Sequence, residues 1–345
     1  MPTGIPLDQR LDALAGLADA LPDPVLILDR RNIVAHRNPA AARDYPAVVR
    51  GQLLTLALRS PVLLGAIDSV RRLSAPQTVE LHQTVPNETW HRATVAPLAG
   101  FEGAIVITLQ SLTEQRRTEQ LRSDFIANAS HELRTPLASL IGFIDTLLGP
   151  AARDEAARER FLGIMRQQAS RMSALIDDLL SLSRIEMRQH VRPTGEVDLV
   201  KLIADVREGL QTQAADAGVT VSIVAPPSVV VTGDLNELYE VFENLIDNAI
   251  KYGGDGGSVE IAIGAGRAGF DYAVTVTDHG AGIAAEHVPR LTERFYRVDA
   301  ESSRKKKGTG LGLAIVKHTL NRHRAQLSIK SKPGEGTRVE VLFAR

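Results

Sequence analysis

Apolar residues recur every three or four positions along two long stretches in the middle of the chain. The first stretch contains Leu133, Leu137, Leu140, Ile141, Ile144 and Leu148, and the second contains Phe161, Met165, Met172, Leu175, Leu179, Leu182 and Ile185. This spacing predicts two amphipathic helices, separated by Gly149, Pro150 and a polar stretch to about Glu155. Two antiparallel helices cannot bury stripes of this length against each other alone. We therefore expect a homodimer in which two hairpins form a four-helix bundle.

The region before the hairpin alternates strand patterns with short helices. Leucines at positions 7, 11, 14, 17 and 21 predict a helix that ends at Pro22. Strand patterns cover 25–28, 33–35, 78–84, 89–95 and 103–109, with helical spacing between 39 and 73. This order of elements resembles that of a PAS domain, and a generic small α+β domain is the alternative. No histidine or cysteine here is placed for haem or flavin attachment, so we expect no cofactor in this domain.

A polar segment, residues 111–124, joins this region to the first long helix. Leu112, Leu121 and Phe125 are near helical or heptad spacing, and the segment contains no glycine or proline. We expect a helical connector; a solvated linker is the alternative.

The C-terminal region, after a boundary at Pro193–Gly195, reads as an α/β domain. Asp198 is placed to cap a helix that runs to Gly218. Asp234 is placed to cap a second helix, which has Glu237 at the capping-box position and ends at Gly253. Strands are expected at 219–224, 229–232, 259–263 and 273–277, then a helix from about Gly310, and a final hairpin around 333–336.

Composition excludes several classes of protein. The chain has 345 residues, 44% of them hydrophobic and 23% charged, which suits two or three soluble domains. It has no cysteine, and its net charge of −1 argues against a nucleic-acid binder. No apolar run is long enough to cross a bilayer, and the N-terminus lacks the core of a signal peptide. We expect a cytoplasmic chain; a fragment whose membrane segments lie upstream is the alternative.

The first candidate for chemistry is the stretch Ser130–Pro136. His131 lies beside the apolar stripe and should face solvent, with a carboxylate next to it at Glu132 and a hydroxyl one turn later at Thr135. Pro136 removes the amide that would bond to the carbonyl of Glu132, so we expect the helix to bend here. Alone, an exposed histidine on a helix is usually a solvated side chain.

Several short motifs downstream favour binding of a phosphorylated ligand. Asn244 and Asn248 share one helix face and offer amide oxygens to a hydrated Mg²⁺, and Lys251 offers charge to phosphate. Asp278 ends a strand before Gly280 and Gly282, where backbone can approach a ligand closely. The third motif, Gly308-Thr309-Gly310-Leu311-Gly312-Leu313, follows a basic run at 304–307 and opens a helix, an arrangement that favours anions. It is neither a dinucleotide fingerprint nor a Walker A motif.

Together these motifs resemble the sensor histidine kinases of two-component systems. The stretch around His131 resembles their H box, and the N, G1, F, G2 and G3 boxes follow in order at 244–252, 278–283, 293–297, 308–313 and 334–337. The resemblance covers about Gln120 to Phe343, and is greatest to the phosphate-regulon sensor kinases. It implies a PAS-like sensor domain at 1–110, a dimerisation and phosphotransfer hairpin at 111–190, and an α/β-sandwich ATP-binding domain of the GHKL type at 191–345.

The resemblance also implies a reaction and its residues. His131 attacks the γ-phosphate of ATP, Glu132 orients or deprotonates the imidazole, and the phosphoryl group passes to an aspartate of a response regulator. Thr135 corresponds to the position that places water when the regulator is dephosphorylated. The residues implied at the nucleotide are Asn244 and Asn248 with Mg²⁺, Lys251, Tyr252, Asp278 for adenine, Gly280, Gly282, Arg297 near the γ-phosphate, and Gly308, Thr309, Gly310, Leu311 and Gly312 in the lid. The implied partners are a second copy, a regulator of phosphate signalling and a membrane protein, but no nucleic acid.

The sequence departs from the family at three points. His279 stands where an asparagine is usual, 322–325 replaces a glycine-containing turn, and the membrane segment that phosphate sensors often carry is absent. Two other readings stay open: a GHKL-type ATPase without phosphotransfer, which Asn244 disfavours because a glutamate is usual there, and a nucleotide-binding signalling scaffold.

Overall fold

A computed structural model describes residues 14–84, 88–253, 257–267, 269–298 and 308–344. By its internal contacts the chain divides into two compact units, Met1–Asp124 and Phe125–Arg345, and each is described by itself. None of the helices in the described ranges has the length and apolar character needed to cross a membrane.

The first unit is built on a five-stranded antiparallel sheet. In the order in which they pair, its strands are β2 (Val34–Arg37), β1 (Val25–Leu28), β5 (Ile105–Ser111), β4 (Thr89–Pro97) and β3 (Gln77–Gln83). Between β2 and β3 lie α2 (Pro39–Asp44), the short η1 (Leu54–Leu56) and α3 (Pro61–Leu73). Leu26, Leu63 and Ile107 are fully buried where helix and sheet meet. All five predicted strands are confirmed, in the element order of the PAS resemblance; the start of the predicted N-terminal helix, residues 1–13, lies outside the described residues.

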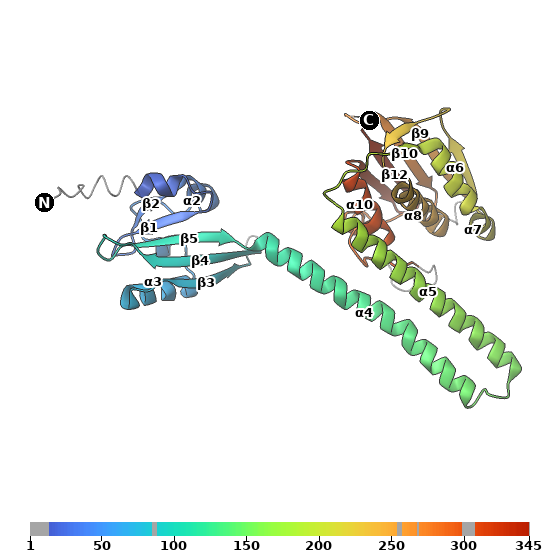
Figure 1. The fold of residues 1–345 in the computed structure, drawn as a ribbon, viewed down its shortest axis with the longest axis horizontal. Coiled ribbons are helices and arrows are strands. Elements are labelled where there is room, and N and C mark those ends of the chain that lie inside the picture. The colour runs from blue at the N-terminus through green and yellow to red at the C-terminus, as the bar shows by residue number, and fades with distance from the viewer. Residues whose placement is uncertain (1–13, 85–87, 254–256, 268, 299–307, 345) are drawn as a thin grey trace. The chain divides into compact units, whose positions relative to one another are not determined.

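Two long helices form the predicted hairpin (Figure 1). α4 (Thr113–Leu148) begins directly after β5, which confirms the helical connector, and it continues past Pro136 without a break. α5 (Glu155–Met187) returns beside it, and the carboxylate of Asp154 caps its N-terminus by accepting from the amide of Ala157. Along the hairpin Leu137, Ile141 and Ile144 remain 42–52% exposed in a single chain.

A second five-stranded sheet forms the C-terminal domain, which confirms the expected α+β class. Its strands pair in the order β11 (Gln326–Lys332), β12 (Gly336–Phe343), β10 (Tyr272–Asp278), β9 (Ser258–Ala265) and β7 (Thr220–Val224), all antiparallel except β7 with β9. α8 (Leu235–Gly253) and α10 (Gly312–Arg322) pack against the sheet, and α6 (Leu199–Gly209) packs on α8 (Figure 1). The core between them includes Phe242, Ile246, Ile261, Val276 and Phe343, each at most 2% exposed.

The structure corrects three local predictions. The helix capped by Asp198 was expected to reach Gly218, but it stops at Gly209 and α7 (Gln211–Asp216) follows. Gly209 has a low helix propensity and lies close to the hydroxyl of Tyr239, which explains the break. A short strand β6 (Glu196–Asp198) pairs with β8 (Val230–Thr232), and the residues 194–198 gave no strand pattern. The last helix begins at Gly312, two residues later than predicted.

Candidate functional site

His131 lies on the exposed side of α4, as predicted. One turn later the hydroxyl of Thr135 donates to the backbone carbonyl of His131 at 3.2 Å, a local contact common for threonine in helices. Pro136, by contrast, is buried. The predicted catalytic residues therefore lie together on little more than one helical turn, with the imidazole open to solvent.

Glu132 lies between two arginines from different parts of the fold. Its Oε2 is 3.3 Å from Nη2 of Arg171 on α5 and 3.9 Å from Nη1 of Arg297, which follows the short helix η3 (Val288–Arg290). The side chains of Glu132, Arg171 and Arg297 are only 27%, 26% and 13% exposed, so salt screens this cluster weakly. Arg297 also donates through Nη2 to the carbonyl oxygen of Gly308 at 2.7 Å. One arginine thus connects the neighbour of His131 to the glycine-rich loop.

Asp278 closes the inner end of the predicted adenine site. Its carboxyl is buried at the end of β10, where Oδ1 accepts from the amides of Gly280 at 3.0 Å and Thr337 at 3.2 Å. Burial raises the pKa of Asp278, while these two amides and the neighbouring His279 act in the opposite direction. Within the described part of the chain no group donates a hydrogen bond to Oδ2. The carboxyl is therefore held in place with one oxygen left for another donor.

Close packing of backbone on backbone explains two of the predicted glycines. A Cβ on Gly280 would lie 2.3 Å from the carbonyl oxygen of Tyr252. Gly282 has φ of +69°, and a Cβ there would lie 1.9 Å from the carbonyl oxygen of Lys332. No larger residue fits at either position without moving the β10 turn that carries Asp278.

On α8, Asn244 and Asn248 are half-buried and one turn apart, as predicted. Asn244 donates through Nδ2 to the carbonyl of Glu240 at 2.9 Å, and its Oδ1 would be 2.3 Å from a Cβ on Gly312. No side chain or backbone group in the described ranges hydrogen-bonds to the amide of Asn248. Asn248 thus offers a free oxygen, whereas Asn244, which lies beside Gly312, is partly committed through its nitrogen.

Lys251 and Tyr252 follow at the end of the same helix. Lys251 forms an ion pair with Asp247, with 2.5 Å between Nζ and Oδ2, and Gln213 donates to the same carboxylate. Tyr252 is 39% exposed, and its hydroxyl would be 3.1 Å from a Cβ on Gly308. Contact of either residue with nucleotide stays a prediction, and the ammonium of Lys251 has donors left for it beyond the one used by Asp247.

The glycine-rich loop rests on the segment that carries Arg297. Gly310 has φ of +77°, a conformation that only glycine adopts readily, and its carbonyl accepts from the amide of Phe295 at 2.8 Å. A Cβ on Gly310 would approach the Cα of Phe295 to 3.0 Å. The basic run at 304–307, predicted to add charge beside this loop, lies outside the described residues.

Two loop residues predicted to line the nucleotide contact α5. The hydroxyl of Thr309 donates to Oδ2 of Asp178 at 2.7 Å. The side chain of Leu311 is fully buried in an apolar cluster between α5 and α10. The buried members of this cluster are Leu175, Leu182, Ile185, Leu311 and Ile315. The loop therefore docks on the hairpin in this arrangement.

Polar side chains that sequence reasoning missed complete this contact. Arg294 forms an ion pair with Glu186, and the hydroxyl of Ser181 donates to Glu240 at 2.8 Å. Burial raises the pKa of both Asp178 and Glu240, although the hydrogen bond that each carboxyl accepts from a hydroxyl acts in the opposite direction. A signal for Asp178 was visible: it lies three residues after Leu175 and four before Leu182, so it places a carboxylate within the apolar stripe of α5.

Two segments of the chain match known protein families. Residues 121–188 match the His Kinase A (phospho-acceptor) domain, and residues 233–345 match the Histidine kinase-, DNA gyrase B-, and HSP90-like ATPase family. The two matches together cover more than half of the chain. His131 lies in the first matched segment, whereas Asn248, Asp278 and the glycine-rich loop lie in the second.

Two curated sensor proteins are similar to more than two thirds of the chain. The phosphate regulon sensor protein PhoR of Pseudomonas aeruginosa is 41% identical over 239 residues, which are 69% of this chain and 54% of that protein. The sensor protein kinase WalK of Staphylococcus aureus is 32% identical over 249 residues, 72% of this chain and 60% of that protein. The solved Acinetobacter baumannii histidine kinase AdeS is 25% identical with a TM-score of 0.49, over 62% of this chain and 97% of that one.

The chain spans little more than half the length of these two curated relatives. Its helical hairpin and its sheet domain occur in the order in which the phospho-acceptor and ATPase families match. The chain belongs to the sensor histidine kinase family.

Proposed function

We propose that this chain is an ATP-dependent protein-histidine kinase that phosphorylates itself on His131 and then transfers the phosphoryl group to an aspartate of a response regulator. The observation that carries the proposal is the position of Arg297. Its guanidinium lies 3.9 Å from Glu132 and donates to Gly308 at 2.7 Å, so it joins the phospho-acceptor helix to the nucleotide loop.

In this reaction the imidazole nitrogen of His131 forms a bond to the γ-phosphorus while the bond to the bridging oxygen breaks and ADP leaves. Glu132 orients the imidazole or accepts its proton. The arginines on either side keep Glu132 in one place, and Arg297 can turn its charge toward the transferred group. Positioning and charge stabilisation supply most of the catalysis in phosphoryl transfer.

The nucleotide would be held by the residues around Asp278. Oδ2 of Asp278, which is left without a donor in the described structure, suits the exocyclic amine of adenine. Asn248 and Asn244 fit a Mg²⁺ ion, because Mg²⁺ takes few protein oxygens when phosphates and water supply the rest. The ion would neutralise phosphate charge. Asn248 has its amide available for this, and Asn244 can keep its Nδ2 contact with the carbonyl of Glu240 while it offers Oδ1.

We further infer that the chain works as a homodimer and also removes phosphate from its regulator. Leu137, Ile141 and Ile144 are 48%, 52% and 42% exposed in one chain, an apolar face that a second hairpin would cover. Thr135 would place the water for dephosphorylation after its hydroxyl leaves the carbonyl of His131. The 41% identity to a phosphate regulon sensor favours a regulator of phosphate signalling. A site of action in the cytoplasm and a membrane partner stay predictions of the family resemblance.

Incubation with γ-labelled ATP and Mg²⁺ tests the proposal. We expect an acid-labile, base-stable phosphoprotein that His131→Ala abolishes, while His190→Ala, a matched change at another exposed histidine, keeps the label. Label that persists in His131→Ala contradicts the choice of acceptor. Asn248→Ala and Asp278→Ala should lose ATP binding with the fold intact, as judged by circular dichroism. Profiling of phosphotransfer against purified response regulators from the same source then identifies the partner.

A further inference from the structure

The sheet of the C-terminal domain has one face that carries charge. On β12, Val339, Val341 and Phe343 point into the core shared with α8, so Arg338 and Glu340 point to the opposite face. The strand register places Lys330 directly opposite Arg338 and Ser328 directly opposite Glu340. Four polar side chains from β11 and β12 therefore share this outer face.

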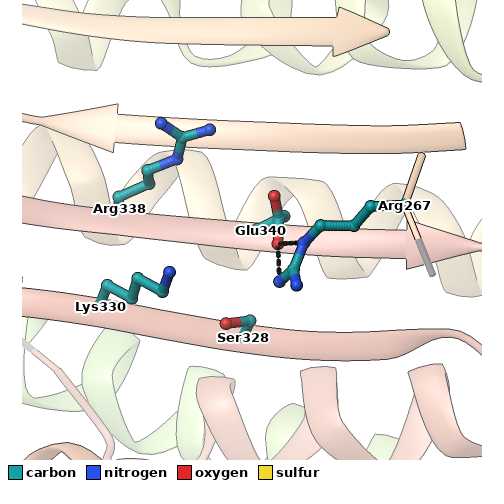
Figure 2. A pocket seen from close by; sticks show the side chains of 5 residues that line it. All are labelled: Arg267, Ser328, Lys330, Arg338 and Glu340. Carbon is teal, nitrogen blue, oxygen red and sulfur yellow. Dashed lines mark hydrogen bonds and ion pairs between the residues drawn. The ribbon is translucent and has the colours of Figure 1, made fainter. Parts of the chain in front are cut away.

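These four side chains and Arg267, which follows β9, line a shallow pocket of about 250 Å³. Figure 2 shows the five side chains over the strands, with Arg267 reaching across to Glu340. The pocket is smaller than typical sites for drug-sized ligands, so its size suits one small polar group.

The charges in the pocket do not balance. Arg267 donates to Oε2 of Glu340 through Nε at 3.1 Å and Nη2 at 2.6 Å. This contact is the main reason why the pKa of Glu340 is lowered, with Arg338 and Lys330 contributing. Glu340 is thus ionised and neutralised by one arginine, which leaves the positive charges of Lys330 and Arg338.

Lys330 and Arg338 are cross-strand neighbours of like charge, a pairing that repels. In the described ranges neither side chain forms an ion pair or a hydrogen bond. Elsewhere on the same strand, Lys332 does find a partner in Glu335. Two adjacent unpaired cations beside a hydroxyl are the donors that a tetrahedral oxyanion requires.

We propose that this pocket is a binding site for a phosphate group, held by the ammonium of Lys330, the guanidinium of Arg338 and the hydroxyl of Ser328. The site lies on the sheet face opposite α8 and is separate from the proposed nucleotide site, so it does not depend on the kinase assignment. The phosphate group is either free inorganic phosphate or an exposed phosphomonoester on a lipid headgroup.

Titration of the full chain with inorganic phosphate, at constant ionic strength in chloride, tests the site by calorimetry. Because the cations are exposed, we expect a dissociation constant on the order of millimolar. The double variant Lys330→Gln/Arg338→Gln should bind at least roughly tenfold more weakly. The charge-matched variant Lys201→Gln/Lys332→Gln changes two other exposed lysines and should bind as the wild type does. The measured quantity is the phosphate binding that is lost in Lys330→Gln/Arg338→Gln. Phosphate bound at the nucleotide site is the same in both proteins and therefore cancels.

Glu340→Gln gives a prediction of opposite sign. The change removes the negative charge and frees Arg267, so phosphate should bind roughly threefold or more tightly. A general loss of folding would weaken binding instead, which separates the two explanations.

Flotation with vesicles of phosphatidylcholine, with and without phosphatidic acid, distinguishes the source. Binding of inorganic phosphate alone identifies a free anion, and binding of phosphatidic acid vesicles, lost in Lys330→Gln/Arg338→Gln, identifies a headgroup. If neither probe binds, or if both double variants behave alike, the proposal is wrong.

Discussion

Three side chains of the nucleotide domain contact the hairpin of their own chain, and from these contacts we expect each protomer to phosphorylate its own His131. Arg297 reaches Glu132, Thr309 reaches Asp178, and Arg294 reaches Glu186. The arginine proposed to face the γ-phosphate therefore already lies beside the phospho-acceptor turn of its own chain.

The linker limits how far the nucleotide domain can move. Residues 188–195 connect α5 to β6 and, fully extended, would span at most about 28 Å. The buried guanidinium of Arg322 donates through Nε to the carbonyl oxygens of Arg188 and Val191, and it also pairs with Glu237 on α8. While those bonds hold, the linker is fixed to the nucleotide domain from Arg188 onward, so the domain is tethered directly to the end of α5. A domain tethered this closely to α5 should find its own histidine before that of the partner.

Mixed dimers with two different tags, purified by both tags in turn, test this directly. A dimer of His131→Ala with Asn248→Ala has one intact histidine and one intact nucleotide site, on different chains. Transfer within a chain predicts background labelling, whereas transfer between chains predicts about half of the wild-type label. The complementary dimer, wild type with the double variant His131→Ala/Asn248→Ala, should give about half of the label within a chain and background between chains.

The two dimers must give opposite results, so poor folding of a variant cannot imitate either outcome. Label in the first dimer and none in the second would refute transfer within a chain. It would also show that the contact between Arg297 and Glu132 does not belong to the phosphorylating arrangement.

Other predictions concern assembly and stability. Ile141→Asp should convert the dimer to monomers in light scattering, because Ile141 lies on the exposed apolar stripe. Gly142→Asp, about 100° further around α4 and outside that stripe, should stay dimeric. Gly282→Ala should lower the free energy of unfolding by about 2–4 kcal/mol in urea titration, since the new Cβ meets the Lys332 carbonyl at positive φ; Gly264→Ala, which has open space, should cost under about 1 kcal/mol. Burial lowers the pKa of His323, so the folded state disfavours protonation of this side chain. Its contribution to stability is therefore present above pH ~6.5 and is lost as the pH falls. His323→Gln should flatten that dependence between about pH 7.5 and 5.5 in thermal unfolding, and equal slopes for the two proteins would contradict the role of His323.

The elements of this fold were predictable where one signal dominated. The 3.6-residue period fixes α4 and α5, and strand patterns closed by turns place β9 to β12 within a few residues. Boundaries set by tertiary contact were not predictable in this way. The break at Gly209 depends on Tyr239 from another helix, and β6 exists because β8 pairs with it.

The capping of α8 illustrates the same limit at a single residue. Asp234 accepts from the amides of Asn236 and Glu237, as a capping box requires. The sequence then suggests that Glu237 returns a hydrogen bond to the amide of Asp234. Instead Nε2 of His323 accepts from that amide at 3.0 Å, and Glu237 pairs with Arg322. Arg322 and His323, at the end of α10 where the sequence departs from the usual turn of the family, thus hold the linker and the start of α8.

Sequence motifs identified the residues that carry the chemistry of the site, but not the side chains that contact them in the folded chain. His131, Asn248 and Asp278 were visible as residue types at meaningful spacing. Arg171 carried no motif, and its contact with Glu132 depends on how α5 lies against α4. Asp178 was visible only as a polar interruption of an apolar stripe, and nothing in the sequence paired it with Thr309.

The contact between Thr309 and Asp178 sets a condition on how the two parts of the site can work. A threonine hydroxyl has one proton to donate, and here it goes to Asp178 at 2.7 Å. The same hydroxyl therefore cannot donate to a phosphate while the loop is docked on α5. Docking also brings Asp178 and Glu240 into buried surroundings that raise both pKa values, so ionised carboxylates oppose it. The apolar cluster around Leu311 must outweigh that opposition. It follows that nucleotide and α5 compete for the hydroxyl proton of Thr309.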